Sequence, residues 1–464
     1  MMKKVLSVVL LLTLSIGYSS AQTEENSESK PVREHLYRVY LKDKQGTNYD
    51  IKRPQAFLSK KALERRRLMG ISIDERDLPV NEQYVRYVER QGMKVVGKSK
   101  WHNTLLVATT DSARAETLTT IKCVKEVRRV HSYNINDKKQ TRTTLAETPT
   151  AKTDASYYGE GTLNINTING TPLHDAGFKG KGMTIAIFDG GFMNADVIPL
   201  LKNVKILGSR DFVYPRCESI FAEGDHGTMV LSCMGANQPG ILVGTAPEAS
   251  YYLFRSEENA HESWAEEDFW TMAAEYADSL GVDIINSSLG YHSFDDKNQN
   301  YRHQDMNGRT SFISQTASML ADKGIVLCNS GGNSGNNAWK KIGVPADASD
   351  ILAVGALTPS RMNARFSSVG PTQDGRVKPD VMSLGAPAQV IGGDGKVKGA
   401  NGTSFASPVL CGMVACLWQA FPHYNARQLM DLIRKTANQA NEPTNVFGYG
   451  IADFGKAYET GKAH

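Results

Sequence analysis

The stretch MTIAIFDGG, residues 183–191, runs through apolar and β-branched residues into an aspartate and two glycines. Four more apolar runs follow it, several of them ending in small residues, at 250–256, 282–290, 324–332 and 351–357. Helical stretches such as 264–280 and 310–323 lie between these runs. Apolar strands that alternate with helices indicate an α/β fold with a doubly wound, mostly parallel sheet that is covered on both faces.

Four polar residues lie just past these strands or at the starts of helices. Asp189 ends the first strand, and Asn333 lies in a glycine-rich loop after the run 324–332. His226 opens an apolar helix in EGDHGTMVLSCMGA, and Ser404 precedes another in NGTSFASPVL. In open α/β sheets, functional groups collect beyond the carboxyl ends of the strands.

Each of these residues also has a purely structural interpretation. Asp189 and Asn333 suit turns, His226 suits a position beside a helix cap, and Ser404 suits the cap itself. Together, however, they supply the acid, the base, the oxyanion donor and the nucleophile of serine acyl transfer. The order along the chain, acid then base then serine, is that of subtilisin. An α/β-hydrolase places its acid and histidine after the serine, so that class does not fit.

The motifs around these residues resemble those of the subtilisin-like serine proteases. GTSFASP (402–408) matches the serine motif of that family, HGTMV (226–230) matches its histidine motif, and SGGN (330–333) matches its oxyanion asparagine. The resemblance implies a secreted serine endopeptidase with Asp189, His226 and Ser404 as the catalytic triad and Asn333 as an oxyanion donor. The aspartate motif differs, because Gly190 stands where the family usually has Ser or Thr.

The same resemblance implies a substrate site and the absence of a catalytic cofactor. In INSSLGY (285–291), the backbone of Ser288, Leu289 and Gly290 is expected to pair with an extended peptide. Gly331 and Gly332 are expected to form the facing wall of the pocket. No metal is needed for catalysis, and we identify no carboxylate-rich loop that would support the structural calcium often found in the family.

The N-terminus has the features of a secretory signal. Lys3 and Lys4 precede an apolar run from Val5 to Gly17, and small residues follow before position 22. We therefore expect residues 1–21 to be a signal peptide. The alternative is a membrane anchor, but the apolar run is short for a span. The predicted location is the periplasm or the extracellular space, with no membrane span left after the signal is removed.

Residues 33–135 predict a separate small α+β domain. Strands are expected at 36–43, 93–100, 103–110 and 124–134, with helices at 56–68, 81–92 and 111–123. The family resemblance implies that this domain is a propeptide with a ferredoxin-like fold, which acts as an intramolecular chaperone and inhibitor. The polar stretch 136–156 is expected to be an exposed linker with a processing site. Residues 157–464 are then the catalytic domain.

The charge is distributed unevenly along the chain. Residues 30–135 hold 23 Lys and Arg against 12 Asp and Glu, whereas residues 136–464 hold 28 against 34. A basic segment can bind nucleic acid, but this one has no nucleic-acid motif. A basic module docked on an acidic one explains the pattern equally well, and an exported chain favours that interpretation. We expect no nucleic-acid partner.

The six cysteines are scattered and have no metal-binding spacing. One disulfide is possible in an exported protein, but Cys328, Cys411 and Cys416 lie in apolar runs and are expected in the core.

Three other functions remain open beside a self-processing endopeptidase, and the third is a nucleic-acid binder that uses residues 30–135. The first is a protease fold that binds peptides without cutting them, which the presence of all four catalytic side chains disfavours. The second is a serine esterase. The strand-like segment Ser288–Tyr291 favours a peptide substrate over an ester. A nucleic-acid binder would show a steep dependence of binding on salt.

Overall fold

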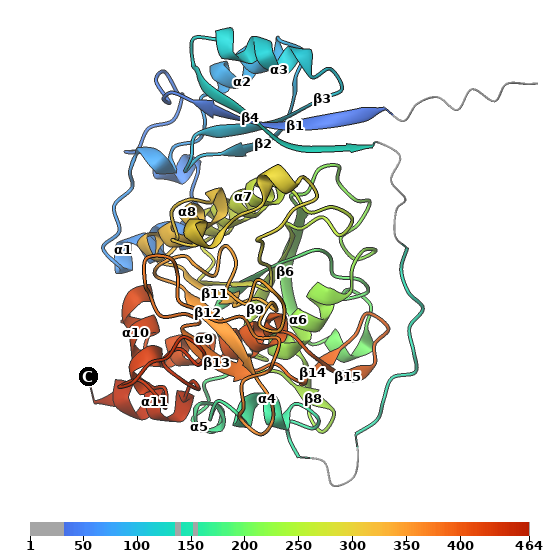
Figure 1. Cartoon of the computed structure of the whole chain (residues 1–464). Helices are drawn as coiled ribbons and strands as arrows, with labels where there is room; N and C mark the ends of the chain where they lie inside the picture. The colour runs from blue at the N-terminus through green and yellow to red at the C-terminus, as the bar shows by residue number, and fades with distance from the viewer. Residues whose placement is uncertain (1–31, 135–140, 152–155, 464) are drawn as a thin grey trace, which may run out of the picture.

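The computed structural model describes residues 32–134, 141–151 and 156–463. A small domain lies on top of a larger one, and the described part of the linker runs down the side of the larger domain (Figure 1). The predicted signal peptide and two parts of the predicted linker, 136–140 and 152–155, lie outside the described residues.

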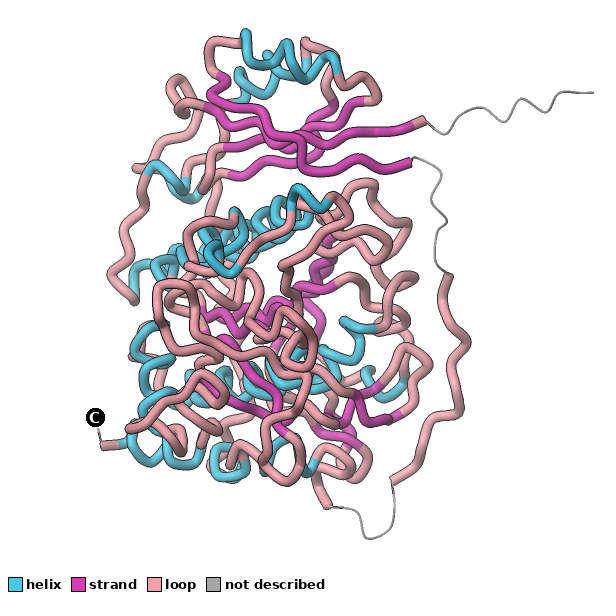
Figure 2. Tube along the Cα trace, viewed as in Figure 1, coloured by secondary structure: helices cyan, strands magenta, loops and turns pink. Residues whose placement is uncertain are grey.

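The small domain is an α+β sandwich. Its elements are β1 (Arg33–Leu41), α1 (Lys60–Leu68), α2 (Glu82–Glu89), β2 (Lys94–Ser99), β3 (Thr104–Thr109), α3 (Ala113–Thr117) and β4 (Val124–Asn134). The sheet order is β2-β3-β1-β4 and every neighbouring pair is antiparallel. Helices α2 and α3 cover the sheet face that points away from the larger domain (Figure 2). The predicted ferredoxin-like arrangement is confirmed.

One predicted helix of this domain lies elsewhere. The stretch 56–68 forms a helix only from Lys60, and this helix, α1, packs beside the larger domain rather than on the sandwich (Figure 1). Its sequence, KKALERRRL, has no apolar face that would cover a sheet.

The larger domain is built on a seven-stranded parallel sheet. Its strands are β5 (Thr184–Asp189), β6 (Lys205–Asp211), β9 (Ser250–Arg255), β10 (Ile284–Ser287), β11 (Val326–Ser330), β12 (Leu352–Leu357) and β13 (Val381–Leu384), with short hairpins β7 (Asn237–Gln238), β8 (Leu242–Val243), β14 (Ala388–Ile391) and β15 (Val397–Ala400). The order is β13-β12-β11-β10-β5-β9-β6. The predicted doubly wound fold is confirmed.

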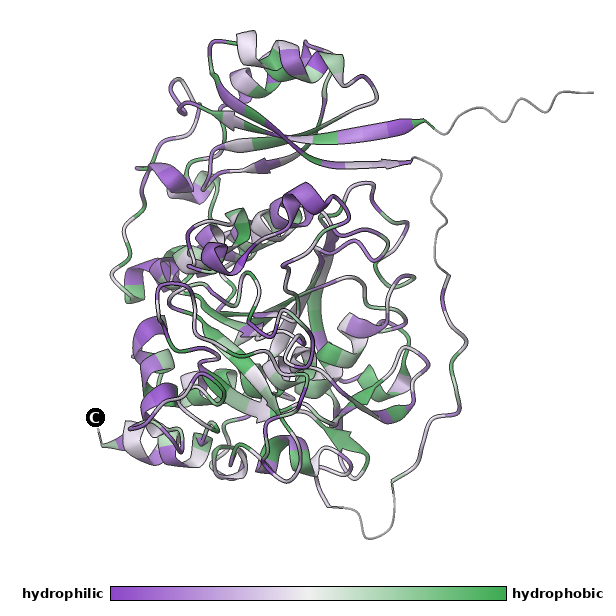
Figure 3. Cartoon of the chain, in the orientation of Figure 1, coloured by the Kyte–Doolittle hydropathy of each residue, from purple (hydrophilic) through white to green (hydrophobic). Residues whose placement is uncertain are grey.

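Helices cover both faces of this sheet. They are α4 (Thr162–Asn166), α5 (Thr171–Asp175), α6 (His226–Gly235), α7 (Ala265–Leu280), α8 (Phe312–Met319), α9 (Thr403–Ala420), α10 (Ala426–Thr436) and α11 (Phe454–Lys462). In β5, Ile185 and Ile187 join the core formed with α6 and α9, whereas Ala186 and Phe188 join the core formed with α7. Burial on both faces explains why the central strands are continuous apolar runs, which Figure 3 shows in the interior.

Helix α9 is the one helix of the described residues that is long and apolar enough to cross a membrane, and it lies buried in the core of the larger domain. All six cysteines are free thiols, and Cys328, Cys411 and Cys416 are buried as predicted.

Candidate active site

The acid and the base lie together at the carboxyl edge of the sheet. Asp189 is the last residue of β5 and is fully buried, and His226 is the first residue of α6. Nδ1 of His226 lies 2.9 Å from each carboxylate oxygen of Asp189. Close approach of the two elements needs a glycine, because a Cβ on Gly227 would lie 2.4 Å from the carbonyl oxygen of Gly191 and 2.9 Å from the Cβ of Asp189.

The surroundings of His226 favour its charged form. Burial lowers the pKa of His226, but the charge of Asp189 and its hydrogen bond raise it, and Glu257 and Asp225 add to this, so that the pKa is raised to about 9. An imidazole with this pKa is a strong proton acceptor whenever it is neutral.

Ser404 lies in the first turn of α9, but it is not the cap of that helix. The cap position is Gly402, with φ of 157°, and no side chain caps the helix. The capping interpretation of Ser404 is therefore wrong. The hydroxyl of Ser404 donates to the carbonyl oxygen of Ser288 at 3.2 Å, and no hydrogen bond to His226 is present in the described part of the chain. The rings of His226 and Phe405, the residue after Ser404, are 5.4 Å apart, so the first turn of α9 packs against His226.

Pro408 explains a second contact of this serine. Proline has no N–H, so the carbonyl of Ser404, four residues earlier, loses its helical donor. The hydroxyl of Ser288 takes that place and donates to the carbonyl oxygen of Ser404 at 2.7 Å. The two serines are thus tied to each other by reciprocal hydrogen bonds, which fix α9 against the end of β10.

A side chain that the sequence did not single out holds Asn333. Both the backbone N–H and the hydroxyl of Thr403 donate to Oδ1 of Asn333, each at 2.9 Å. The same hydroxyl accepts a hydrogen bond from the N–H of Gly332 at 3.1 Å. With Oδ1 occupied in this way, Nδ2 of Asn333 has no partner in the described residues, and neither has the backbone N–H of Ser404. These are two unpaired donors beside the serine hydroxyl.

The predicted substrate segment directly follows β10. Ser288 and Leu289 are buried, whereas Gly290 is exposed and its backbone makes no hydrogen bond within the described residues. Gly331 is held against β12 by its N–H, which donates to Val354 at 2.8 Å. An exposed, unpaired backbone beside the end of a strand is what an added peptide strand needs.

The glycine after Asp189, Gly190, is required by a steric contact. A Cβ on Gly190 would lie 2.3 Å from Oδ1 of Asn259 and 3.1 Å from Oε2 of Glu257. Nδ2 of Asn259 donates to the carbonyl of Gly190 at 2.9 Å. Burial raises the pKa of Glu257, with further rises from Asp189 and Glu262, to about 8. Asn259 and Glu257 thus fill the space beside Asp189, and no sequence motif marked either of them.

Two segments from the N-terminal part of the chain border this site. The ring of His131, near the end of β4, lies 5.6 Å from the ring of His261, two residues after Asn259. In the linker, the carbonyl of Thr143 accepts a hydrogen bond from Asn194 at 2.7 Å. The small domain and the linker therefore adjoin the residues that surround Asp189 and His226.

Comparison with known proteins agrees with this geometry. Residues 180–450 match the model of the subtilase family. The chain belongs to the subtilase family. Residues 36–146 match the peptidase S8 propeptide domain of Bacteroidota. This subtilase is accordingly a serine endopeptidase with an N-terminal propeptide, made as a zymogen.

Its relatives include several bacterial subtilisins. The chain is 28% identical over 292 residues to subtilisin NAT of Bacillus subtilis subsp. natto, which covers 62% of this chain and 68% of that protein. It is 28% identical to subtilisin DY of Bacillus licheniformis, over 62% of this chain and 93% of the other. The epidermin leader peptide processing serine protease of Staphylococcus aureus has the same fold, with a TM-score of 0.64 at 17% identity, over 92% of this chain and 98% of that one.

Subtilases need no cofactor for catalysis. In the described residues, no group of three or more His, Cys, Asp or Glu side chains has an arrangement that would hold a metal ion.

Proposed function

We propose that this subtilase is exported and cuts its own linker, with Asp189, His226 and Ser404 as its catalytic triad. The observation that carries the proposal is the arrangement at the carboxyl edge of the sheet. A buried carboxylate holds the histidine at 2.9 Å, and the ring of Phe405, the residue after Ser404, lies 5.4 Å from the ring of that histidine. The backbone N–H of Ser404 and Nδ2 of Asn333, which the preceding Thr403 holds through Oδ1, are unpaired within the described residues. Export rests on the basic and apolar features of residues 1–21.

In the proposed reaction, Ser404 Oγ attacks the peptide carbonyl carbon as Nε2 of His226 accepts its proton. Nδ1 of the imidazole stays hydrogen-bonded to Asp189, which fixes the tautomer and stabilises the imidazolium. The oxyanion accepts hydrogen bonds from Nδ2 of Asn333 and the N–H of Ser404. The imidazolium then protonates the leaving amine, and water hydrolyses the acyl-enzyme by the same steps.

The substrate is proposed to bind as an extended strand against Ser288, Leu289 and Gly290, with Gly331 and Gly332 on the facing side. The free backbone of Gly290 supports this. An esterase would need no such strand, so a panel of peptide and ester substrates separates the two activities.

The test compares the chain without residues 1–21 with its Ser404→Ala variant, by intact mass and N-terminal sequencing. We expect the wild type to be cut between residues 136 and 156 and the variant to stay whole. Ser360→Ala, an exposed serine away from the site, is the matched control and should be cut like the wild type. If Ser404→Ala is also cut in pure preparations, or if wild type stays whole and cleaves no peptide, the proposal fails.

A further inference from the structure

Part of the propeptide leaves its sandwich and contacts the catalytic domain separately. We call this part the arm and define it as residues 54–78, which contain α1. In Figure 1 the arm descends from the sandwich along the side of the catalytic domain. It contacts the end of α7 and the amino-terminal ends of β5 and β10. This surface is remote from the catalytic centre, because β5 rises about 3.3 Å per residue between Thr184, which the arm contacts, and Asp189 at its other end.

Two adjacent arginines of the arm are buried in this surface. Arg65 and Arg66 are 5% and 2% exposed, and both bind Asp278, which is fully buried. Nη2 of Arg65 lies 2.5 Å from Oδ1 of Asp278, and Nη2 of Arg66 lies 3.0 Å from its Oδ2. Arg65 also donates from Nε to the carbonyl of Lys323 at 3.1 Å and from Nη1 to the carbonyl of Val282. An arginine pair therefore neutralises a buried carboxylate and satisfies two backbone carbonyls.

Each side of this contact supplies both cations and carboxylates to the ion pairs that cross it. Lys323 of the catalytic domain is 2% exposed and its Nζ lies 2.9 Å from Oδ1 of Asp77 in the arm. At the start of α1, Lys61 donates to Thr184 at 2.6 Å and to Asp283 at 2.7 Å.

The catalytic domain is shaped to accept the arm. Gly281, which ends α7 with φ of 82°, leaves room for α1: a Cβ there would lie 2.6 Å from the backbone nitrogen of Ala62 and 2.8 Å from the carbonyl carbon of Lys61. The N–H of Ser59 donates to the carbonyl of Ser279 at 2.9 Å. The arm thus packs backbone against backbone on this surface.

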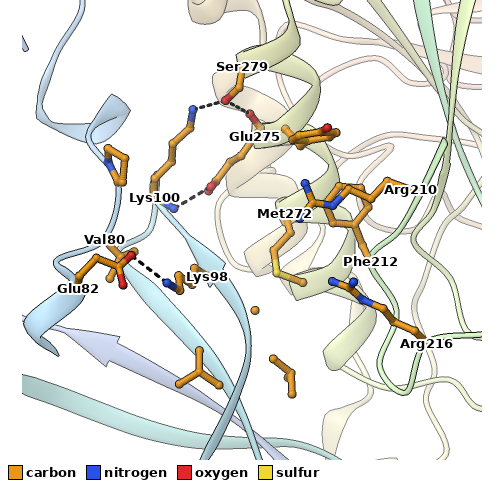
Figure 4. Close-up of a pocket in the computed structure, with 15 residues that line it drawn as sticks. Val80, Glu82, Lys98, Lys100, Arg210, Phe212, Arg216, Met272, Glu275 and Ser279 are labelled. Atoms are coloured by element: carbon orange, nitrogen blue, oxygen red, sulfur yellow. Dashed lines mark hydrogen bonds and ion pairs between the residues drawn. The ribbon is translucent and has the colours of Figure 1, made fainter. Parts of the chain in front are cut away.

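The sandwich uses a different part of α7. The carboxylate of Glu275 accepts from the hydroxyl of Ser99 and from the N–H groups of Lys100 and Trp101. A cavity of about 380 Å³ lies between this part of α7 and β2, lined also by Arg210 (Figure 4). The sandwich and the arm therefore contact neighbouring parts of α7, and they share one carboxylate, because Nζ of Lys100 also lies 3.7 Å from Oδ2 of Asp278.

We propose that the surface formed by Asp278, Val282, Asp283 and Lys323 is a second docking site for the propeptide, specific for a helix with two adjacent arginines. The arm precedes β4 and the linker in the chain, so a cut in the linker breaks none of its bonds. The docking site lies outside the substrate groove, so substrate does not compete for it. The cleaved propeptide consequently stays bound until the arm detaches. The proposal concerns the period after the linker cut and rests on the proposed function to that extent.

The test uses the full chain with Ser404→Ala, and with the recognition sequence of a site-specific protease inserted after Thr150. The added protease makes the cut, so the result does not depend on self-processing. The measurement is the rate at which the propeptide dissociates after the cut, by gel filtration and native mass spectrometry. The double variant Arg65→Ala/Arg66→Ala is compared with Arg67→Ala, whose side chain is 69% exposed on the same helix.

We expect the double variant to release the propeptide at least about a hundredfold faster, because removing one side of a buried ion pair leaves the other uncompensated. Arg67→Ala should release it at the rate of the parent chain. If the double variant does not fold, Lys61→Ala tests the proposal instead, because the Lys61 side chain is 42% exposed and its loss leaves no buried charge in the arm. We expect this variant to release the propeptide several-fold faster than the parent chain. Release at the parental rate by the folded double variant, or by Lys61→Ala, overturns the proposal.

Discussion

Thr403→Val removes one hydroxyl while keeping the shape of a side chain that is fully buried beside Ser404. The hydroxyl makes two hydrogen bonds, to Oδ1 of Asn333 at 2.9 Å and from the N–H of Gly332 at 3.1 Å. The backbone N–H of residue 403 still donates to Oδ1 of Asn333. The carboxamide therefore keeps one of its two anchors and becomes free to rotate about it.

The size of the effect follows from that partial loss. A neutral hydrogen bond contributes about 0.5–1.5 kcal/mol, and about 1.4 kcal/mol is a factor of ten in rate. We expect kcat to fall about tenfold with KM within about twofold, because the donor acts on the oxyanion of the transition state. Complete removal of the donor in Asn333→Ala should cost about 10²–10³ in kcat.

The assay is steady-state hydrolysis of a peptide by the mature enzyme, arranged as a double-mutant cycle. Because Thr403 acts through Asn333, the double variant Thr403→Val/Asn333→Ala should be no slower than Asn333→Ala alone. Thr403→Ser, which keeps the hydroxyl, should restore most of kcat. A Thr403→Val enzyme with unchanged kcat, or costs that simply add in the double variant, would refute this account of how Asn333 is held.

Two further predictions concern charge. The acidic limb of the pH profile of kcat/KM should lie in the alkaline range, because His226 must be neutral to accept a proton and its pKa is raised to about 9. Glu257→Gln removes one of the charges that raise this pKa and should shift the limb to lower pH, whereas the control Glu258→Gln should not. Equal pH profiles for the wild type and both variants would contradict the assignment of His226 as the base. Arg38 binds Asp268 across the interface with Nε–Oδ1 and Nη2–Oδ2 distances of 2.8 and 2.6 Å, both side chains being buried. Arg38→Ala should lower the free energy of unfolding of the uncut zymogen by about 3–5 kcal/mol, as measured by denaturant titration. A loss below about 1 kcal/mol is what removal of an exposed ion pair costs, and it would argue against a structural role for Arg38.

Most of the fold was predictable because its signal is local. The central strands are buried on both faces, so their residues are apolar throughout and stand out in the sequence. β6 was not predicted, since it is the half-exposed edge strand KILGSRD. β13 was missed because its four residues, VMSL, are not part of a longer apolar run like the one that contains β10. The helix α1 was predicted, but not its position, because nothing in the run KKALERRRL indicates that two of its arginines are buried.

The proposed catalytic residues could be singled out for another reason, namely that each stands in a motif with neighbouring glycines. Their supporting residues were not. Thr403 is read as part of the serine motif, but its bonds to Asn333 join segments 70 residues apart. Glu257 and Asn259 lie in a polar loop, and only the fold brings them against Gly190. Such contacts depend on the packing of strand ends, which no short stretch of sequence encodes.

Helix α7 explains part of the uneven distribution of charge along the chain. Three carboxylates of this helix, Asp268, Glu275 and Asp278, are spaced by seven and three residues, which places them on one helical face. Each is buried, and its partners are side chains or N–H groups of the propeptide. Because these partners leave with the propeptide, the mature enzyme must hydrate all three carboxylates, and burial in the zymogen is possible only while the basic propeptide is present. Part of the excess of Lys and Arg in residues 30–135 therefore serves this interface, where Arg38, Arg65 and Arg66 bind buried carboxylates of α7.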